Sequence, residues 1–220
     1  TFAYVAGGER WLGEVSGRGD AYLFLGGGAY TLPRAVAGRD PSARITVIEL
    51  DPEVTRVAYR WFGLRPEHGI VSVHGDARAV VEGWAAEGRG GWDRVYVDVY
   101  GGRESLPHSL VTLEALATLR SLLKPGGTLA FNVIGTAVGE GSLRFWSTVR
   151  TAAAVFPSVQ LYHHLGHDYP ERQNFLLALS PEAGRRWPER AGMFETWPRE
   201  EWPEEEGTVV FRDRPAPRAE

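Results

Sequence analysis

The chain has 220 residues, a formal net charge of -4 at pH 7 and a pI of about 5.9. It contains no cysteine, which excludes thiol catalysis, disulfides and cysteine-ligated zinc. The acidic balance and the lack of a basic stripe argue against nucleic-acid binding, which depends on phosphate neutralisation. No apolar run approaches the roughly 20 residues of a membrane-spanning helix and no secretory leader is recognisable, so we expect no membrane span and a cytoplasmic location.

Short apolar runs alternate with helix-period segments from Ala21 to Val133. The first run, AYLFL, ends in three glycines and is typical of a buried parallel strand. Asp51 followed by Pro52 indicates a helix start, and the segment Lys-Pro-Gly-Gly from Lys124 indicates a helix end. Strands are therefore predicted at 21–25, 44–50, 70–74, 93–99 and 128–134, and helices at 31–37, 52–62, 76–86 and 109–123.

The pattern changes after Ile134. A helix is predicted at 142–155, followed by two β-rich runs at 159–164 and 175–179. The connection between these runs is too short for a crossover helix, so the last two strands should be antiparallel. The elements together predict an α/β fold with a mostly parallel seven-stranded sheet, ordered 3-2-1-4-5-7-6, that ends in an antiparallel C-terminal hairpin.

The two ends of the chain have little periodicity. The first twenty residues read as irregular, and the last forty are rich in Pro, Glu, Arg and Trp, with one candidate short strand at 208–211. We therefore predict a short N-terminal extension at 1–20, one Rossmann-like ligand-binding domain at 21–180 and a tail at 181–220.

Ligand-binding residues are expected at the carboxyl ends of the parallel strands, where α/β sheets bind their ligands. Gly26, Gly27 and Gly28 follow the first strand and let a ligand approach the backbone and the N–H groups of the next helix. Glu49 ends the second strand, where a carboxylate accepts hydrogen bonds from both ribose hydroxyls. Thr31 stands where the dinucleotide fingerprint has its third glycine, which disfavours NAD.

Carboxylates also follow the third and fourth strands. Asp76 can accept a hydrogen bond from the exocyclic amine of adenine, while the neighbouring N–H of Ala77 reaches a ring nitrogen. A helix N-cap is an equally good interpretation of Asp76. Asp98 ends the fourth strand and points into the same crevice. Acceptor groups at the ends of four successive strands predict a nucleoside site.

The motifs LFLGGGAYTLPR, VIELDPEV, VHGDARAVV, DRVYVDVYGG and LLKPGGTLAFNV resemble spermidine synthases and their relatives in order and spacing. In particular they resemble the spermidine synthase-like domains that some bacteria fuse to membrane transporters. The resemblance covers about residues 21–180 and implies a class I methyltransferase fold. It also implies a sulfonium nucleoside, S-adenosylmethionine or its decarboxylated form. By this similarity Gly26–Gly28 hold the aminopropyl or methionine part, Glu49 the ribose, and Asp76 with Ala77 the adenine.

The resemblance also implies where the acceptor binds. Tyr169 lies in an Asp-Tyr-Pro segment that resembles the family's Thr-Tyr-Pro segment, so Tyr169 and Asp98 would face the acceptor, with Tyr100 as a further contact. Asp98 is the candidate general base, and His108 in the following loop is the second candidate. A solvent-facing loop position is an equally good interpretation of His108.

The chain departs from the family at two carboxylates. Ala29 stands where the family holds the amino group of decarboxylated S-adenosylmethionine, and Gly101 stands where it keeps a base for the attacking amine. We therefore expect a poor spermidine synthase that still binds the nucleoside. Three functions stay open. The first is an alkyl transferase that acts on a small acceptor, above all an amine. The second is a methyltransferase, and the third is a non-catalytic nucleoside-binding or partner domain. A homodimer is left open.

The histidine-rich segment near Asp168 does not predict a metal site. His163 and His164 are neighbours on a predicted strand, so their side chains point to opposite faces and do not readily ligate one ion together. No metal is therefore expected.

Overall fold

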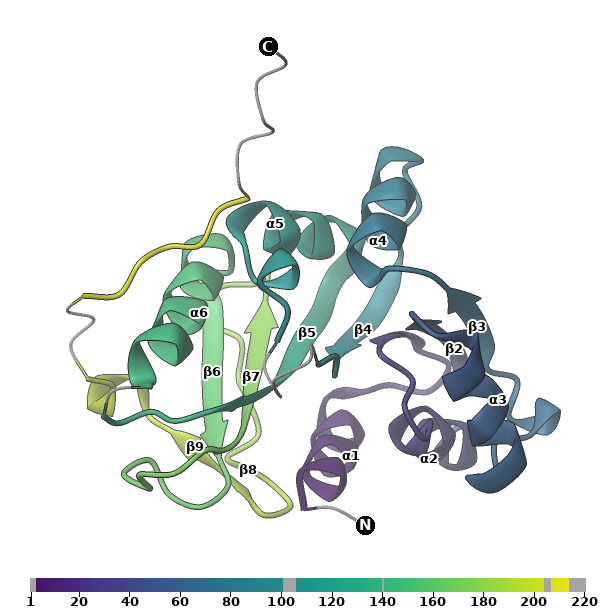
Figure 1. Cartoon of the computed structure of the whole chain (residues 1–220), viewed down its shortest axis with the longest axis horizontal. Helices are drawn as coiled ribbons and strands as arrows, with labels where there is room; N and C mark the ends of the chain where they lie inside the picture. The colour runs from purple at the N-terminus through teal and green to yellow at the C-terminus, as the bar shows by residue number, and fades with distance from the viewer. Residues whose placement is uncertain (1–2, 101–105, 140, 204–206, 214–220) are drawn as a thin grey trace.

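The computed structural model describes residues 3–100, 106–139, 141–203 and 207–213. These residues form a nine-stranded sheet in the order β3-β2-β1-β4-β5-β7-β6-β9-β8 (Figure 1). The strands are β1 (Ala21–Leu25), β2 (Arg44–Glu49), β3 (Val71–His74), β4 (Trp92–Val97), β5 (Leu123–Gly135), β6 (Ser158–His163), β7 (Gln173–Ser180), β8 (Arg190–Ala191) and β9 (Phe194–Trp197). The helices are α1 (Ala3–Val15), α2 (Thr31–Arg39), α3 (Pro52–Trp61), α4 (Ala77–Ala86), α5 (Leu113–Leu122) and α6 (Ser142–Val155), with short 3-10 helices η1 (Pro66–His68), η2 (His108–Leu110) and η3 (Arg199–Glu201).

The first seven strands confirm the predicted order. β1 pairs in parallel with β2 and β4, and β5 is parallel to β4. β7 is antiparallel to both β5 and β6, as the short connection after β6 predicted. The carboxyl ends of β1, β2, β3, β4 and β5 therefore lie along one edge of the sheet, where the candidate site residues follow them.

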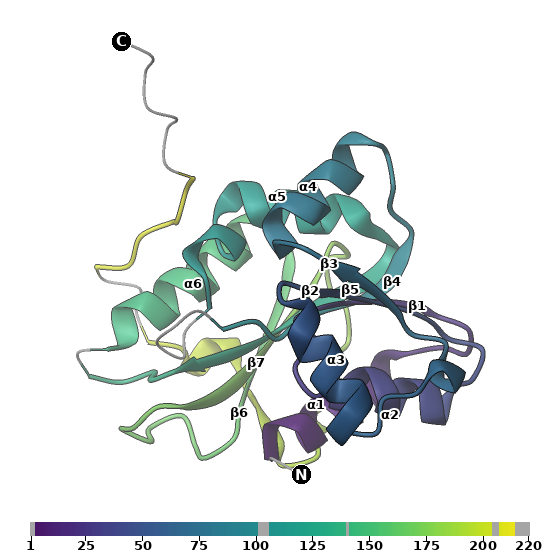
Figure 2. The same cartoon turned by 45° about the vertical axis from the view of Figure 1, so that its right-hand side comes forward.

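Helices cover the sheet on both faces (Figure 2). One apolar core joins α4, α5 and α6 to the sheet and contains Trp84, Leu119 and Phe145. The second core joins α1, α2 and α3 to the other face and contains Trp11 and Val36. The alternation of side chains along the strands supplies both cores, because successive residues point to opposite faces.

The sheet has nine strands rather than the predicted seven. β9 adds antiparallel to the outer edge of β6, and β8 pairs with β9. The prediction of a short strand at 208–211 is wrong. In that segment the Val209 N–H donates to Ser147 Oγ at 3.1 Å and the Phe211 N–H to Thr151 Oγ1 at 3.0 Å. These backbone donors bind side chains of α6, so they are not available to a strand ladder.

The prediction that the first twenty residues are irregular is also wrong, because α1 occupies most of them. Gly7 and Gly8 weaken the helix signal in the sequence. In the structure they allow close packing: a Cβ at Gly7 would lie 2.1 Å from the Phe194 ring, and one at Gly8 would lie 2.6 Å from the Tyr96 hydroxyl. Trp11 is fully buried on the same helix and anchors it.

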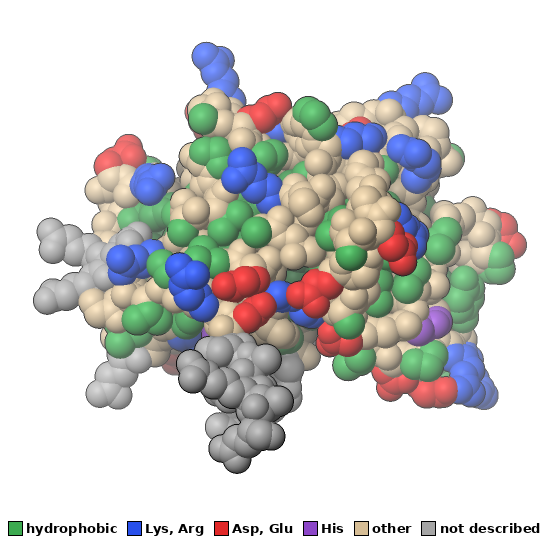
Figure 3. Space-filling model, turned by 90° about the horizontal axis from the view of Figure 1, so that it is seen from above, with side chains coloured by type: hydrophobic (Ala, Val, Ile, Leu, Met, Phe, Trp, Pro, Cys, Tyr) green, Lys and Arg blue, Asp and Glu red, His purple; other side chains and the backbone are tan. Residues whose placement is uncertain are grey.

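The surface carries mixed charge. On the face shown in Figure 3, arginine and acidic side chains alternate with apolar ones, and no single block of positive charge covers it. Within the described parts of the chain, no helix is both long and apolar enough to cross a bilayer.

Asp213, at the end of the described chain, forms hydrogen bonds with residues of α4 and of the α5 N-cap. Its carboxylate accepts from Arg78 Nη2 at 2.6 Å and from the buried Thr112 hydroxyl at 2.7 Å. We expect Asp213→Ala to lower the free energy of unfolding by about 1 kcal/mol, because Arg78 and Thr112 lose a shared acceptor. Urea denaturation measures the change. Arg212→Ala, at an exposed neighbour, is the control, and an equal loss in that variant would contradict this role.

Candidate active site

Glu49 organises the glycine loop that follows β1. The residue is 9% exposed, and Oε2 accepts from the N–H groups of Gly27 and Gly28 at 2.8 and 3.2 Å. Its other oxygen, Oε1, accepts from the Asp51 N–H at 3.1 Å. One carboxylate thus ties the loop after β1 to the loop after β2. In this way the carboxylate also shapes the surface that a ligand would meet.

The first glycine of the loop allows β1 and β4 to approach closely at their carboxyl ends. Gly26 has a φ of +93°, and a Cβ there would lie 2.3 Å from the carbonyl oxygen of Asp98. Gly28 also has a positive φ, +49°, but a Cβ there would meet no atom within 4 Å. The loop therefore packs against the protein at Gly26 and faces open space at Gly28.

Tyr30 packs against the glycine loop that follows β1, and the sequence did not predict it as a site residue. It adopts the left-handed conformation with a φ of 56°, and its side chain is fully buried. The hydroxyl pairs with Thr55 Oγ1 at 2.8 Å and donates to Ser72 Oγ at 3.0 Å. A Cβ at Gly27 would lie 2.6 Å from the Tyr30 ring, so the loop rests on this ring. No signal in the sequence beyond its place after the glycines marks it.

Asp76 has a structural role and also faces the site. Its Oδ1 accepts from the Ala79 N–H at 2.9 Å, so it is the N-cap of α4. Its side chain also lines the cavity at the strand ends, beside Ala77. The capping and ligand-facing interpretations are therefore compatible, because the cap bond engages a single carboxylate oxygen.

A hydrogen-bonded network spans three strands around Asp98. The Asn132 side-chain amide on β5 donates to Asp98 Oδ1 at 3.0 Å and also to the Tyr100 hydroxyl oxygen. Asn132 is buried, and its own oxygen accepts from Asn174 Nδ2 on β7 at 2.9 Å. Asn132 and Asn174 were not among the predicted site residues, although an asparagine inside the apolar run TLAFNVI is a signal that could have found Asn132.

The environment of Asp98 shifts its proton affinity. Burial raises the pKa of the Asp98 carboxyl, and hydrogen bonds from Asn132 and Tyr100 partly offset this rise. Burial and the charge of Asp98 also raise the pKa of Tyr100. The pair thus consists of a carboxylate with increased basicity beside a phenol that stays neutral, an arrangement that favours proton acceptance by Asp98.

A cavity of about 380 Å³ at the strand ends brings most of the predicted residues together. We call it the nucleoside cavity after the ligand that the sequence predicts, and Asn132 connects to it through Asp98 and Tyr100. Among its described lining residues, four are acidic and none is basic. The predicted residues that line it are Gly26, Gly28, Glu49, Asp76, Ala77, Asp98 and Tyr100.

A smaller cavity of about 220 Å³ adjoins it on the side of α1. It shares Gly26, Gly28, Asp98 and Tyr100 with the nucleoside cavity and also includes Gly27. Its lining is completed by further residues that include Ala29 on the glycine loop and Tyr4 on α1. Tyr4 was missed because α1 itself was not predicted.

Two predicted residues lie outside both cavities. His108 is exposed in η2 and its ring packs 5.1 Å from the ring of Phe211. Tyr169 is part-exposed, and its hydroxyl donates to Glu171 at 3.2 Å. Gly101 lies outside the described residues. The geometry thus leaves Asp98 as the candidate base that the structure places at the site.

No group of three or more potential metal ligands occurs among the residues that the structure describes. Burial and the neighbouring His167 lower the pKa of His163, whose ring lies 6.0 Å from that of His167.

Comparisons with known proteins agree with the fold. The chain is similar to a probable spermidine synthase from Corynebacterium glutamicum ATCC 13032, with a TM-score of 0.78 and 22% identity over 98% of this chain and 81% of that one. It is also similar to human methyltransferase-like protein 13 in complex with SAH, with a TM-score of 0.69 and 22% identity over 86% of each chain.

The chain has a spermidine synthase-like class I methyltransferase fold. The resemblance predicted from the sequence motifs is therefore confirmed for the fold. No family model matches the chain.

Curated proteins that this chain resembles are named as transferases. The polyamine aminopropyltransferase of Vibrio vulnificus (strain CMCP6) is 31% identical over 115 residues, which are 52% of this chain and 38% of that protein. The eEF1A lysine and N-terminal methyltransferase of Danio rerio is 32% identical over 140 residues, 61% of this chain and 19% of that protein. The chain thus spans well under half the length of these relatives.

Proposed function

We propose that this chain is a transferase that binds S-adenosylmethionine or its decarboxylated form and alkylates a small acceptor. The observation that carries the proposal is the acidic nucleoside cavity at the strand ends, beside a glycine loop that is open at Gly28. A sulfonium is cationic, so a cavity lined by carboxylates such as Glu49 and Asp76 suits it. The relatives named as transferases support the same class of activity.

Three residues would hold the cosubstrate. Glu49 would accept from the ribose hydroxyls and Asp76 from the adenine amine, while Gly28 leaves room for the sulfur-bearing arm. When bound, the sulfonium supplies a carbon activated for displacement, and the carbon–sulfur electron pair leaves on sulfur.

Asp98 would act as the base. As the acceptor's lone pair forms its bond to carbon, Asp98 takes the proton that the acceptor releases and later passes it to water. The Asn132 amide donates to one carboxylate oxygen of Asp98 and so fixes the orientation of the base. Tyr100, as a neutral phenol, would help to orient the acceptor.

Methyl transfer is the second candidate, and Ala29 favours it. A carboxylate at this position would repel the carboxylate of S-adenosylmethionine and attract the free amine end of the decarboxylated form. Alanine lines the smaller cavity instead, which removes that preference. The methyltransferase among the relatives supports this candidate.

Calorimetric titration tests the proposal. S-adenosylmethionine and methylthioadenosine should bind, NAD should not, and decarboxylated S-adenosylmethionine should show whether Ala29 has shifted donor preference. Failure of both S-adenosylmethionine and methylthioadenosine to bind would refute the proposal.

We expect Glu49→Gln to weaken methylthioadenosine binding by about 1–3 kcal/mol, or about 5- to 150-fold, because the ribose hydroxyls lose a charged acceptor. Titration calorimetry measures the change. Glu53→Gln is the matched control, because Glu53 is exposed on α3 and pairs with Arg56 outside the cavity. Unchanged affinity in Glu49→Gln would reject the assignment of Glu49.

We also expect the chain to be a poor spermidine synthase. Putrescine is cationic, and the two carboxylates that the family uses are replaced by Ala29 and Gly101. Loss of a general base costs about a hundred- to ten-thousand-fold in rate. Product analysis with putrescine and decarboxylated S-adenosylmethionine checks this, beside a parallel methyl-transfer assay. Turnover near the usual lower range of enzymes, about one per second, would overturn the prediction.

A further inference from the structure

The only two asparagines of the chain, Asn132 and Asn174, bind each other beside the candidate base. They are far apart in the sequence, but the pairing of β5 with β7 brings them together. The antiparallel register places Asn132 opposite Leu176 and Asn174 opposite Ile134, so the two asparagines are diagonal neighbours. Side chains two positions apart on a strand point to the same face of the sheet, and the two amides therefore meet on one face.

The contact between the two amides determines which way the Asn132 side chain points. A side-chain amide has one oxygen, which accepts hydrogen bonds, and one NH₂ group, which donates two. The Asn132 oxygen accepts from Asn174 Nδ2 at 2.9 Å. The Asn132 nitrogen therefore points the other way, where it donates to Asp98 Oδ1 at 3.0 Å and to the Tyr100 hydroxyl oxygen. Both N–H groups of Asn132 are thus used at the candidate base.

Burial makes this orientation important. Asn132 is 1% exposed, so water does not readily replace a lost partner. In the reverse orientation the Asn132 oxygen would face the Asp98 carboxylate, and two acceptors would meet without a proton between them. A buried acceptor left in this way is costly. The hydrogen bond from Asn174 favours the orientation in which Asp98 receives a donor.

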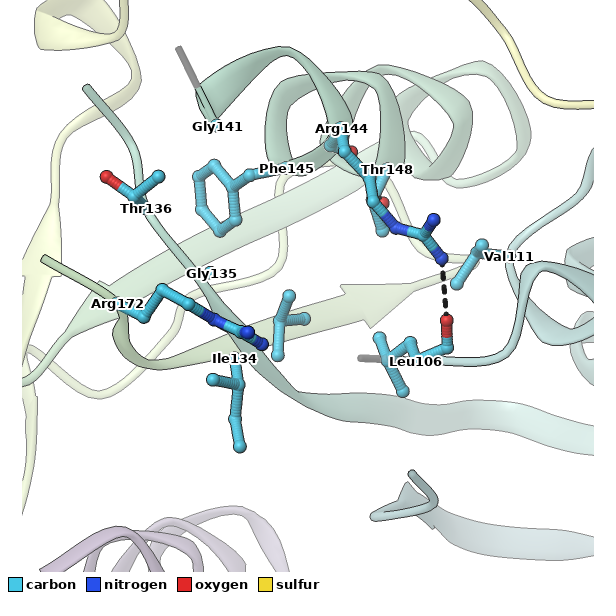
Figure 4. A pocket seen from close by; sticks show the side chains of 11 residues that line it. Leu106, Val111, Ile134, Gly135, Thr136, Gly141, Arg144, Phe145, Thr148 and Arg172 are labelled. Atoms are coloured by element: carbon cyan, nitrogen blue, oxygen red, sulfur yellow. Dashed lines mark hydrogen bonds between the residues drawn. The ribbon is translucent and has the colours of Figure 1, made fainter. Parts of the chain in front are cut away.

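Asn174 itself lies away from the candidate site. It is half-buried, and it is not among the residues that line the two cavities of that site. It does not line the neighbouring cavity of Figure 4 either, although it lies opposite Ile134 and two residues after Arg172, which are both labelled there. Asn174 therefore acts on the site through the Asn132 amide.

Several titratable groups surround Asp98. Hydrogen bonds from Asn132 and Tyr100 lower the pKa of Asp98, against the larger effect of burial. The charge of Asp98 raises the pKa values of Tyr4 on α1 and of Tyr96 on β4, so these phenols, like Tyr100, stay neutral while Asp98 titrates. The other carboxylates of the nucleoside cavity are Glu49, Asp51 and Asp76.

We propose that Asn174 is a positioning residue of the active site, which keeps the Asn132 donor on Asp98 and thereby sets the pH range in which Asp98 acts as the base. This inference rests on the proposed transferase function. A hydrogen bond donated to a carboxylate favours its ionised form. Without Asn174 the Asn132 amide is free to turn, Asp98 loses this donor, and its carboxyl keeps its proton to a higher pH.

Nuclear magnetic resonance of the unliganded chain tests the orientation of the amides. Asparagine labelled with nitrogen-15 in its side chain gives two NH₂ groups in the whole chain, and Asn174→Ala leaves one, which assigns both. The Asn132 protons should change their chemical shift as the pH rises from about 4 to 8, because they bind the titrating carboxylate. This change should be absent in Asp98→Ala.

The titration midpoint of Asp98 tests the role of Asn174. Carbon-13 shifts of the aspartate carboxyl groups give this midpoint, and Asp98→Ala assigns the signal. Asn174→Ala should raise the midpoint by about 0.5–1 pH unit, the size expected for the loss of one hydrogen bond. Asn174→Gln, which keeps an amide, should raise it less.

Two further variants serve as controls. Gln160→Ala removes an amide from the adjacent strand β6 that donates to backbone carbonyls, and it should leave the midpoint unchanged. Asn132→Ala should raise the midpoint, and Asn174→Ala added to that variant should raise it no further, because Asn174 acts through Asn132. Thermal denaturation of each variant establishes that it is folded.

The outcomes separate this inference from the proposed function. An unchanged midpoint in Asn174→Ala, an equal rise in Gln160→Ala, or a further rise in the double variant would overturn the role of Asn174, even where methylthioadenosine binds. The expected rise without any binding of S-adenosylmethionine or methylthioadenosine would instead overturn the proposed function, and Asn174 would still control the protonation of Asp98.

Discussion

Replacing Asp98 with asparagine is expected to lower the rate of alkyl transfer by about a hundred- to ten-thousand-fold, because the reaction loses its base. Methylthioadenosine affinity should stay within about threefold, since Glu49 and Asp76 remain. Single-turnover kinetics and calorimetry measure the two effects. Asp51→Asn is the control: Asp51 lines the same cavity, and asparagine retains its role as the N-cap of α3. An equal loss of rate in both variants would show that cavity charge, rather than Asp98, supports the reaction.

The same residue should impose a stability cost that depends on pH. Burial raises the folded-state pKa of Asp98 above its unfolded value, so its ionisation in the folded state is unfavourable. The contribution of protonated Asp98 to the free energy of unfolding is fully present below the unfolded carboxyl pKa of about 4. It is lost as the pH rises through the folded-state pKa of Asp98. Asp98→Asn should therefore be more stable than the unmodified chain at pH 7, with the difference disappearing at low pH. The acidic limb of the transfer rate should lie above pH 4 for the same reason.

Adding one methyl group at Gly26 is expected to lower the free energy of unfolding by about 2–5 kcal/mol. A Cβ there would lie 2.3 Å from the backbone oxygen of Asp98, and a backbone atom cannot rotate away as a side chain does. The φ of +93° adds strain for any residue other than glycine. Urea denaturation followed by circular dichroism measures the loss.

Gly28→Ala is the matched control in the same loop. Its Cβ would meet no atom within 4 Å, so this variant should lose only about 1–2 kcal/mol from its positive φ. The new methyl group would extend into the space that a ligand needs, so methylthioadenosine binding should weaken by about 5- to 150-fold. Equal destabilisation of the two variants would contradict the proposed difference between the packed and open ends of the loop.

Local signals in the sequence were sufficient for the central part of the fold. Each of the seven strands was predicted from a short apolar run, and Asp51 was correctly read as the start of α3. The start of α5 was placed at 109, whereas Thr112 is its N-cap. α1 was missed because Gly7 and Gly8 disfavour a helix locally, while their benefit is contact with Phe194 and Tyr96, far along the chain. β8 and β9 were missed because strands of two and four residues depend on tertiary pairing, β9 with β6 and β8 with β9.

Some residues of the candidate site could also be predicted from the sequence, and others could not. Glu49, Asp76 and Asp98 follow strands directly, so their meeting at one edge follows from parallel topology alone. Asn132 and Asn174 act through the register of β5 against β7, and no spacing in the sequence fixes that register. Tyr169 was predicted from a motif, but its segment lies outside both cavities in this structure.

The contact between α1 and the β8–β9 hairpin has a consequence for synthesis on the ribosome. Trp11 stacks against Trp187 at 6.2 Å, and Gly7 packs on Phe194, so this helix completes its burial only with residues made some 180 positions later. At about 5–20 residues per second, that interval lasts about 10–40 s. During it, the part of α1 that packs against Trp187 and Phe194 stays uncovered, although α2 and Tyr96 can already contact the rest of the helix. The burial of α1 is therefore completed only late in synthesis, after the strands of the central sheet have been made.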